Sequence, residues 1–590
     1  MLVSDFILSR MAEWGIERLF GYPGDGINGI LGAMNRQDRI RFIQARHEES
    51  AAFMACAHAK FTGRTGVCLA TSGPGAIHLL NGLYDARMDH QPVVAVVGQQ
   101  RRMSLGSNYQ QEVDLVSLFK DVAHEYVQMV TVPSQTRQVI DRAFRIASEK
   151  RTVTVVIVPL DVQEEKMEQT PKRTHGNVVT GVGHSFAKTI PTYEELKNAA
   201  AILNQSERVA ILVGAGAFGA EEEVSQIAEL LGAGVAKALL GKMVLPDDLP
   251  YVTGSIGMLG TKPSWELMEG CDTLLMIGSS FPYAEYLPEP GKARGIQIDS
   301  DAQRLSIRYP MEVNLLGDSK ATLQRLIPLL QYKSDRSWRK EVEKQVAKWK
   351  EVVESRAMQP ADPINPQRVV MELSQRLPDK CIVSADSGTC AFWYARNLTC
   401  RRGMKGSLSG NLASMGPAVP YAIAAKFAYP DRIPIALVGD GAMQMICMNE
   451  LITIAKYWKE WENPGLLVVV FNNCDLNMVT WEQRILSGEA KYEASQDIPD
   501  VPYAEFAKLL GLAGMRVEEE DEIGPALDSL LDAGRPAVLD VVTDPNVPIV
   551  PSHISMENLS NYFKALMKGD AEQFPMIRQT IRELMQGGIA

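Results

Sequence analysis

The sequence predicts an α/β protein of three tandem domains, each built on a mainly parallel sheet with helices on both faces. Its 590 residues exceed what one hydrophobic core usually serves, which predicts about three or four domains. Short runs of Val, Ile and Leu alternate with segments of helical periodicity along the chain. This alternation is typical of parallel sheets whose strands are connected through helices.

The first domain is expected at residues 1–165 and opens with an amphipathic helix at 3–15. Its buried strands are expected at 67–71, 92–98 and 153–159. A polar stretch at 163–191 has no periodicity and is interpreted as a linker.

The second domain is expected at residues 190–332. Its helix is expected at 195–205 and its strands at 208–214, 272–278 and 295–299. The segment GAGAFG at 214–219 matches the GxGxxG pattern of dinucleotide sites. However, Lys237 and Gly241 follow the next strand where a ribose-binding acid would be expected, so we interpret the segment as a tight turn.

A charged helix is expected at 337–356, followed by the third domain at 362–550 and a helical tail at 551–590. The strands of the third domain are expected at 381–386, 434–440, 466–473 and 537–543.

Composition excludes several classes of protein. Apolar residues make up 46% and charged residues 22% of the chain, as in ordinary globular proteins. The net charge of −11 offers no basic surface for nucleic acid. Eight cysteines without a CxxC pair argue against a disulfide framework or a zinc site and suit a reducing cytoplasm.

The N-terminus does not have the pattern of a signal peptide, because Asp5 and Arg10 interrupt its apolar stretch. No uninterrupted apolar run of about 18 residues follows. We therefore expect a cytoplasmic protein, either soluble or peripheral to the inner face of a membrane.

The strongest chemical signal is Gly439-Asp440-Gly441 at the end of one expected strand, with Asn472-Asn473 at the end of another. Ligands of open α/β sheets bind outside the carboxyl ends of the strands. Gly441 would let the main chain approach a diphosphate, and the following helix would direct its positive N-terminus at that anion. Asp440 and Asn473 supply the oxygen ligands that Mg²⁺ prefers.

This arrangement resembles the diphosphate and magnesium motif of thiamine-diphosphate enzymes, with a longer spacer near KEWENPG at 459–465. Arg46-His47-Glu48 resembles the segment with the family's cofactor-activating glutamate, and 410–425 the segment with an apolar residue beneath the cofactor. With 21–31 and 71–86, the resemblance covers almost the whole chain. It implies a thiamine-diphosphate-binding fold with a central FAD-type domain. Within the group of pyruvate oxidases and acetolactate synthases, the resemblance is closest to pyruvate oxidase of the quinone type (pyruvate dehydrogenase).

The resemblance implies roles for individual residues. Glu48 would bond a ring nitrogen of the aminopyrimidine and favour the tautomer that removes the thiazolium proton. Met415 would hold the bent shape of the cofactor. The implied metal ligands are Asp440, Asn473 and Asp475. The implied contacts with thiamine diphosphate are Ala413, Ser414, Met415, Asp440, Gly441, Ala442, Asn473, Asp475, Leu476, Asn477 and Met478.

FAD is implied by three segments of the second domain, IGMLG at 256–260, GSSFP at 278–282 and IQIDS at 296–300, which resemble FAD-binding segments of the same enzymes. The implied FAD contacts are Gly257, Met258, Leu259, Gly278, Ser279, Ser280, Phe281, Pro282 and Asp299.

Glu482 resembles a glutamate that pyruvate oxidases place near the substrate, where acetolactate synthases usually have tryptophan. Gln111 is expected beside the reacting carbons. Two positions depart from the family pattern: Asn477 stands where glycine is usual, and Gln110 stands where phenylalanine is expected. Both put the identity of the substrate in doubt.

The resemblance favours oxidative decarboxylation of a small 2-oxo acid, pyruvate above all, to acetate or acetyl phosphate and carbon dioxide, with quinone or oxygen as acceptor. The alternatives are an acetolactate synthase-like carboligase and a non-oxidative decarboxylase with structural or absent FAD. A scaffold protein is the alternative from another class, and the presence of Glu48, Met415, Asp440 and Asn473 argues against it.

Glu48 and Asp440 lie in different domains, and in the enzymes that the chain resembles the site forms between two subunits. A homodimer or homotetramer is therefore implied. In the tail, Phe574, Ile577, Ile581, Leu584 and Met585 share one helical face, as in a helix at a membrane surface. A helix packed against its own protein is the alternative.

Overall fold

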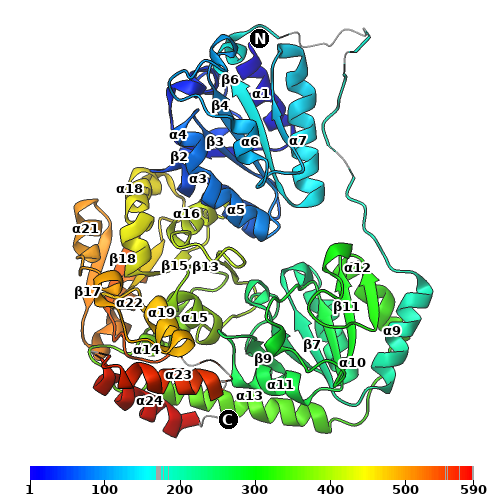
Figure 1. Cartoon of the computed structure of the whole chain (residues 1–590), viewed down its shortest axis with the longest axis vertical. Coiled ribbons are helices and arrows are strands. Elements are labelled where there is room, and N and C mark those ends of the chain that lie inside the picture. The colour runs from blue at the N-terminus through cyan, green and yellow to red at the C-terminus, as the bar shows by residue number, and fades with distance from the viewer. Residues whose placement is uncertain are drawn as a thin grey trace.

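A computed structural model describes residues 1–167, 175–176, 178–183, 185–549, 551, 553, 556–570 and 572–587, with side chains described as far as residue 581. It contains three six-stranded parallel sheets, which confirm the predicted architecture of three tandem α/β domains (Figure 1). The predicted linker at 163–191 lies partly outside the described residues.

The N-terminal sheet has the strand order β2-β1-β3-β4-β6-β5. Its strands are β1 (Arg18–Gly21), β2 (Arg41–Gln44), β3 (Gly66–Ala70), β4 (Val93–Gln99), β5 (Val127–Met129) and β6 (Val153–Pro159). Its helices are α1 (Val3–Glu13), α2 (Asn28–Met34), α3 (Glu48–Thr62), α4 (Pro74–His78), α5 (Leu80–Met88), α6 (Leu115–Phe119), α7 (Thr136–Lys150) and α8 (Leu160–Glu164).

Both faces of this sheet are buried, which explains why its strands are continuously apolar in sequence. Along β4, Val93 and Ala95 pack into the core beneath α3 and α5, whereas Val94 and Val96 pack into the core beneath α1 and α7. This alternation is the two-residue period of a strand between two helical layers.

The central sheet has the order β12-β11-β10-β7-β8-β9. Its strands are β7 (Val209–Val213), β8 (Gly234–Lys237), β9 (Val252–Ser255), β10 (Thr273–Ile277), β11 (Arg294–Asp299) and β12 (Val313–Leu316). Its helices are α9 (Tyr193–Gln205), α10 (Glu221–Leu231), α11 (Lys262–Gly270) and α12 (Ser319–Leu326). In chain order this is the 3-2-1-4-5-6 arrangement of dinucleotide-binding folds, which places the switch point between β7 and β10.

The C-terminal sheet, β14-β13-β15-β16-β18-β17, repeats the topology of the N-terminal sheet. Its strands are β13 (Ile382–Ala385), β14 (Lys405–Ser407), β15 (Pro434–Gly439), β16 (Leu467–Asn472), β17 (Ala513–Val517) and β18 (Ala537–Val542). Its helices are α14 (Pro366–Arg376), α15 (Thr389–Arg396), α16 (Ala418–Ala428), α17 (Asp440–Ala442), α18 (Met448–Tyr457), α19 (Asn477–Glu482), α20 (Glu493–Gln496), α21 (Tyr503–Leu509), α22 (Ile523–Leu531), α23 (Met556–Met567) and α24 (Gln573–Gly587). Helix α13 (Ser337–Ala357) connects the central and C-terminal domains, with Val342 and Val346 in a core of the central domain and further contacts with α14 and α24.

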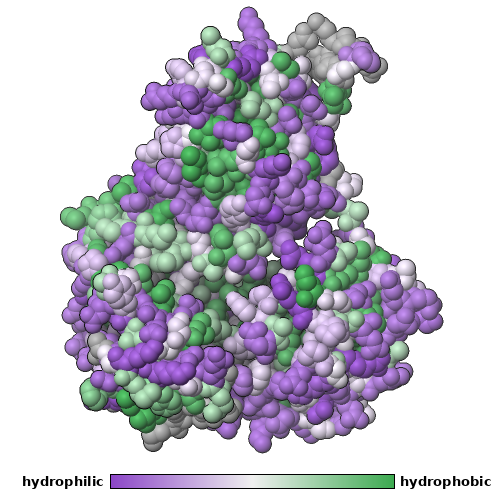
Figure 2. All heavy atoms as spheres, in the orientation of Figure 1, coloured by the Kyte–Doolittle hydropathy of each residue, from purple (hydrophilic) through white to green (hydrophobic). Residues whose placement is uncertain are grey.

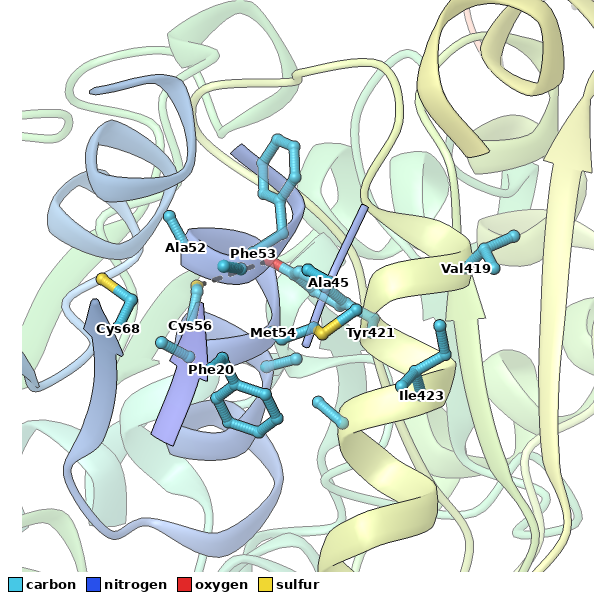
Figure 3. Close-up of a cluster of buried hydrophobic side chains, with 14 of the residues drawn as sticks. Phe20, Ala45, Ala52, Phe53, Met54, Cys56, Cys68, Val419, Tyr421 and Ile423 are labelled. Atoms are coloured by element: carbon cyan, nitrogen blue, oxygen red, sulfur yellow. Dashed lines mark hydrogen bonds between the residues drawn. The ribbon is translucent and has the colours of Figure 1, made fainter. Parts of the chain in front are cut away.

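The N-terminal and C-terminal domains share one hydrophobic core, in which α3 packs along α16 (Figure 3). Phe53 and Met54 of α3 meet Tyr421 and Ile423 of α16 there. Helix α3 can pack closely because it is rich in alanine. The two domains are therefore held together within one chain by apolar contact.

A buried charge network crosses the same contact. The Lys60 ammonium lies 2.7 Å from Asp89 Oδ2 and 2.7 Å from the Tyr421 hydroxyl. Asp89 also accepts main-chain N–H groups of Gly410 and Asn411 from the C-terminal domain. Burial lowers the pKa of Lys60, but Asp85 and Asp89 outweigh that effect and raise the pKa above its ordinary value. Lys60 is thus held charged inside the contact.

The tail packs on the C-terminal domain through one face of α24, where Met576 is buried. Phe574, Ile577 and Ile581 are exposed, and the side chains of Leu584 and Met585 lie outside the described residues. Within the described part of the chain, no helix has the length and apolarity to cross a membrane.

The buried network makes a prediction about stability. Replacing Lys60 by Met leaves Asp85 and Asp89 buried without their cation, so the free energy of unfolding should fall by about 3–5 kcal/mol. Urea unfolding followed by fluorescence would show a lower midpoint. The exposed Lys197→Met is the matched control, expected within about 0.5 kcal/mol of the parent. Equal midpoints for the two variants would contradict this account.

Candidate active site

A cleft of about 2070 Å³ opens where the three domains meet, and Figure 2 shows the surface hollowed there. Of the residues proposed from sequence for thiamine diphosphate and FAD, all except Ser414 line it, and so does Glu482. Neither Glu48 nor Gln111, both of them described residues, is among its lining residues. One chain therefore brings together most of the expected site but not all of it.

The ends of β15 and β16 lie side by side, since Gly439 pairs with Phe471. Asp440 Oδ2 accepts the main-chain N–H of Asn473 at 2.8 Å and that of Cys474 at 2.6 Å. Burial raises the pKa of Asp440 to about 6, against the opposing effect of these N–H groups. A buried carboxylate of this kind favours a nearby cation.

Strand β15 ends at Gly439, one residue earlier than the sequence predicts, and a helix begins directly at Asp440. This helix continues through a π-helical turn at Met443–Cys447 into α18. Its first turn carries main-chain N–H groups without partners inside the helix, which suit an anion. A Cβ atom at Gly441 would lie only 2.7 Å from the Leu476 side chain and 3.2 Å from that of Met415. Because glycine has no side chain, Leu476 and Met415 can lie this close to the main chain at Gly441.

The carboxylate of Asp475 is occupied by side chains of its own domain. It accepts hydrogen bonds from Asn477 at 2.9 Å and Thr480 at 2.8 Å, and Lys491 Nζ lies 3.1 Å from it. The atom that Asp475 could offer to a metal is therefore its main-chain carbonyl oxygen. Asn477, at a position where glycine was expected, holds this carboxylate and also bonds the carbonyl of Pro545.

The loop that carries Met415 is fixed by Asp386, which the sequence analysis did not identify. This carboxylate follows β13 and accepts the N–H groups of Gly416 at 2.9 Å and Ala418 at 3.1 Å. Ser387 donates to the carbonyl of Ser414 at 2.7 Å. Two adjacent residues at one strand end thus set the position of Met415.

Glu48 begins α3 and is almost fully buried. Its Oε2 lies 3.0 Å from His78 Nδ1, and a side chain at Gly75 would meet its Oε1 at 3.0 Å. Gln111, in the left-handed region with φ 60°, packs over Gly73 of the same turn and accepts a hydrogen bond from Ser72. Glu48 and Gln111 therefore form a second group of residues around the turn before α4, separate from the cleft.

The switch point of the central domain lines the cleft. The turn after β7 packs main chain against main chain on the turn after β10: a side chain at Gly214 would lie 2.4 Å from the Gly278 carbonyl oxygen. A side chain at Gly216 would lie 2.7 Å from the Cα atom of Gly278, which has φ 56°. The GAGAFG segment does form a tight turn, and it also lines the cleft beside Ser279 and Phe281. The strand order, which sequence did not show, is the signal that would have drawn attention to it.

Asp299 ends β11 at the same edge, and burial raises its pKa. Glu482, at the end of α19, is half-buried on the cleft wall, and burial raises its pKa as well. Both carboxyl groups are thus placed where a ligand in the cleft would meet them.

Comparison with known proteins agrees with this arrangement of domains. Residues 1–118 match the model "Thiamine pyrophosphate enzyme, N-terminal TPP binding domain", residues 196–326 the central domain and residues 386–541 the C-terminal TPP binding domain. A putative thiamine pyrophosphate-containing protein, YdaP of Bacillus subtilis, is 34% identical over 97% of this chain and 98% of its own.

Two further relatives have more specific names. A probable acetolactate synthase large subunit of Methanococcus aeolicus is 31% identical over 92% of both chains. The pyruvate oxidase of Lactiplantibacillus plantarum is 27% identical over 95% of this chain and 92% of its own.

Two cofactor-binding domains on either side of a central α/β domain define the class of protein. The chain belongs to the thiamine pyrophosphate enzyme family.

The burial of Asp386 predicts how the stability of the protein depends on pH. Burial raises its pKa from 3.8 to about 6, so the folded chain holds this proton more tightly than the unfolded chain. The contribution of Asp386 to the free energy of unfolding therefore falls by about 3 kcal/mol as the pH rises from below 3.8 to above about 6. Asp386→Asn removes this titration. Urea midpoints measured from about pH 4 to 7 should fall less in the variant than in the parent; parallel profiles would contradict the assignment.

Proposed function

We propose that this protein uses thiamine diphosphate, Mg²⁺ and FAD to decarboxylate a small 2-oxo acid oxidatively. Pyruvate is the proposed substrate, acetate or acetyl phosphate and carbon dioxide are the proposed products, and quinone or oxygen is the proposed acceptor.

The proposal depends chiefly on the continuity of the cleft. One space extends from the switch point at Gly278 to the strand ends at Asp440 and Asn473. Its volume exceeds the roughly 300–1,000 Å³ of a typical small-ligand pocket, so it has room for two large cofactors. Residues of the central and C-terminal domains would therefore hold the two cofactors within one continuous space.

The residues of the C-terminal domain suit a metal-bound diphosphate. The Asp440 carboxylate, the Asn473 side chain and the Asp475 carbonyl would bind Mg²⁺, whose charge would offset the burial of Asp440. The first turn after Gly439 would bind the diphosphate. The central domain suits FAD, because Gly214, Gly216 and Gly278 keep side chains away from the switch point.

The bound coenzymes would supply the carbanion chemistry and the two-electron acceptor. Glu48 would hold a proton at the aminopyrimidine ring, and Met415 would support the bent cofactor. Glu482 and Gln111 would orient the substrate. Because Glu48 and Gln111 lie outside this chain's own cleft, a second copy would complete each site. We therefore propose a homodimer or homotetramer.

A carboligase that keeps FAD for structure is the second candidate. It is favoured by the acetolactate synthase relative, which at 31% identity exceeds the 27% of the pyruvate oxidase. Glu482 favours the oxidase. Acetate or acetyl phosphate as product would distinguish the oxidase from a synthase that forms acetolactate.

The oxidase proposal predicts a flavin that responds to substrate. The purified protein should be yellow, and pyruvate added without oxygen should bleach the flavin absorbance because the two electrons have no other acceptor. Absorbance spectra with and without pyruvate measure this. A colourless protein that retains thiamine diphosphate would refute the oxidase, and a yellow one that forms acetolactate without bleaching would favour the carboligase.

Glu48→Gln tests the activation step. Loss of its proton-holding group should lower turnover by about 100-fold or more, with the variant still folded. Steady-state rates with a range of 2-oxo acids measure this, and the exposed Glu17→Gln is the control, expected to match the parent. Unchanged turnover in Glu48→Gln would contradict the catalytic assignment.

A further inference from the structure

Asp570 lies in the turn between α23 and α24, yet its carboxylate is almost completely buried. Arg484 donates to it in the forked geometry of a bidentate pair, at 2.9 Å from Nε and 2.8 Å from Nη2. The Arg484 side chain is equally buried. The C-terminal segment is therefore joined to the C-terminal domain by an ion pair that solvent does not reach.

Arg484 belongs to a π-helical turn, Gln483–Ser487, that continues α19 directly after Glu482. Its guanidinium lies over the Trp481 ring, 5.3 Å from the centroid. The guanidinium of Arg484 thus contacts Trp481, the residue directly before Glu482. Insertions of this kind in a helix occur often at functional sites.

A further contact of Asp570 leads toward Asp475, a proposed metal ligand. Its Oδ2 accepts the main-chain N–H of Lys491 at 2.9 Å. The Lys491 ammonium lies 3.1 Å from Asp475 Oδ1 and 2.6 Å from Asp497. Asp570 therefore holds both the helix that ends at Glu482 and the lysine that fixes Asp475.

Docking of the tail does not depend on this pair alone. Tyr562 stacks on Trp481, and Asn561 donates to the carbonyl of Leu486 at 2.9 Å. Buried ion pairs are costly to desolvate and contribute little net stability, whereas a fork fixes one relative orientation. The contribution of the Arg484–Asp570 pair is thus the orientation of α19 relative to the tail.

We propose that Asp570 is a positioning residue of the active site, acting on Glu482 through Arg484 and on Asp475 through Lys491. This inference rests on the function proposed above. The C-terminal segment is then part of the scaffold of the site.

Two variants of the full-length holoenzyme separate the effect through Arg484 from the effect through Lys491. Asp570→Asn disturbs both, so kcat/KM for pyruvate and the affinity for thiamine diphosphate with Mg²⁺ should each fall about 10- to 100-fold, as is usual for residues behind a ligand shell. Arg484→Lys keeps the contact between Asp570 and Lys491, so only kcat/KM should fall. Steady-state kinetics and calorimetric titration of the cofactor measure these, with thermal unfolding to check folding.

Lys568→Gln is the matched control, because Lys568 and Glu489 join the same two segments by an exposed ion pair. It should leave kcat/KM and cofactor affinity within about two-fold of the parent, in line with the small worth of surface pairs. A lower unfolding temperature in Asp570→Asn with unchanged kcat/KM and cofactor affinity would overturn the proposal. If the parent does not turn over pyruvate, the proposed function fails, while cofactor affinity still tests Asp570.

Discussion

The whole site depends on the hydrogen bonds between Asp440 and the end of the neighbouring strand. By accepting the N–H groups of Asn473 and Cys474, the carboxylate joins the ends of β15 and β16. The parallel register of the two strands brings those ends to one edge of the sheet. The turn at Asp440–Ala442, the loop with Asp475 and residues of α19 all follow these strand ends and line the cleft. A change in the register would separate all three.

The shared core of α3 and α16 imposes the second constraint. It fixes the N-terminal domain against the C-terminal domain of the same chain, in an arrangement where Glu48 does not line the cleft that contains Asp440. The buried Lys60 network makes that arrangement costly to change. The proposed division of the site between two copies would therefore follow from how one chain packs, because this packing keeps Glu48 away from the chain's own cleft.

Sequence predicted the architecture well because the buried strands are short apolar runs between helical patterns, as β4, β6 and β16 show. It missed β1, β5, β9, β12, β14 and β17, which lie at or beside sheet edges and are only partly apolar. It indicated the cleft residues through local motifs such as Gly439-Asp440-Gly441. The role of Asp386 could not be predicted because its partners, Gly416 and Ala418, are about thirty residues away in the sequence. A carboxylate that anchors a distant loop has no local pattern.

The tail shows the same limit more strongly. Phe574, Ile577 and Ile581 share a helical face that sequence can detect, and they are exposed. The contacts that connect the tail to the site are polar and lie elsewhere: Arg484 and Asp570 are 86 positions apart. Amphipathic periodicity identifies a helix and its apolar face, but it does not show which partner a buried charge will meet. The contacts between this tail and α19 therefore could not be predicted from sequence. Only the folded chain brings the turn that contains Asp570 against the helix that carries Glu482.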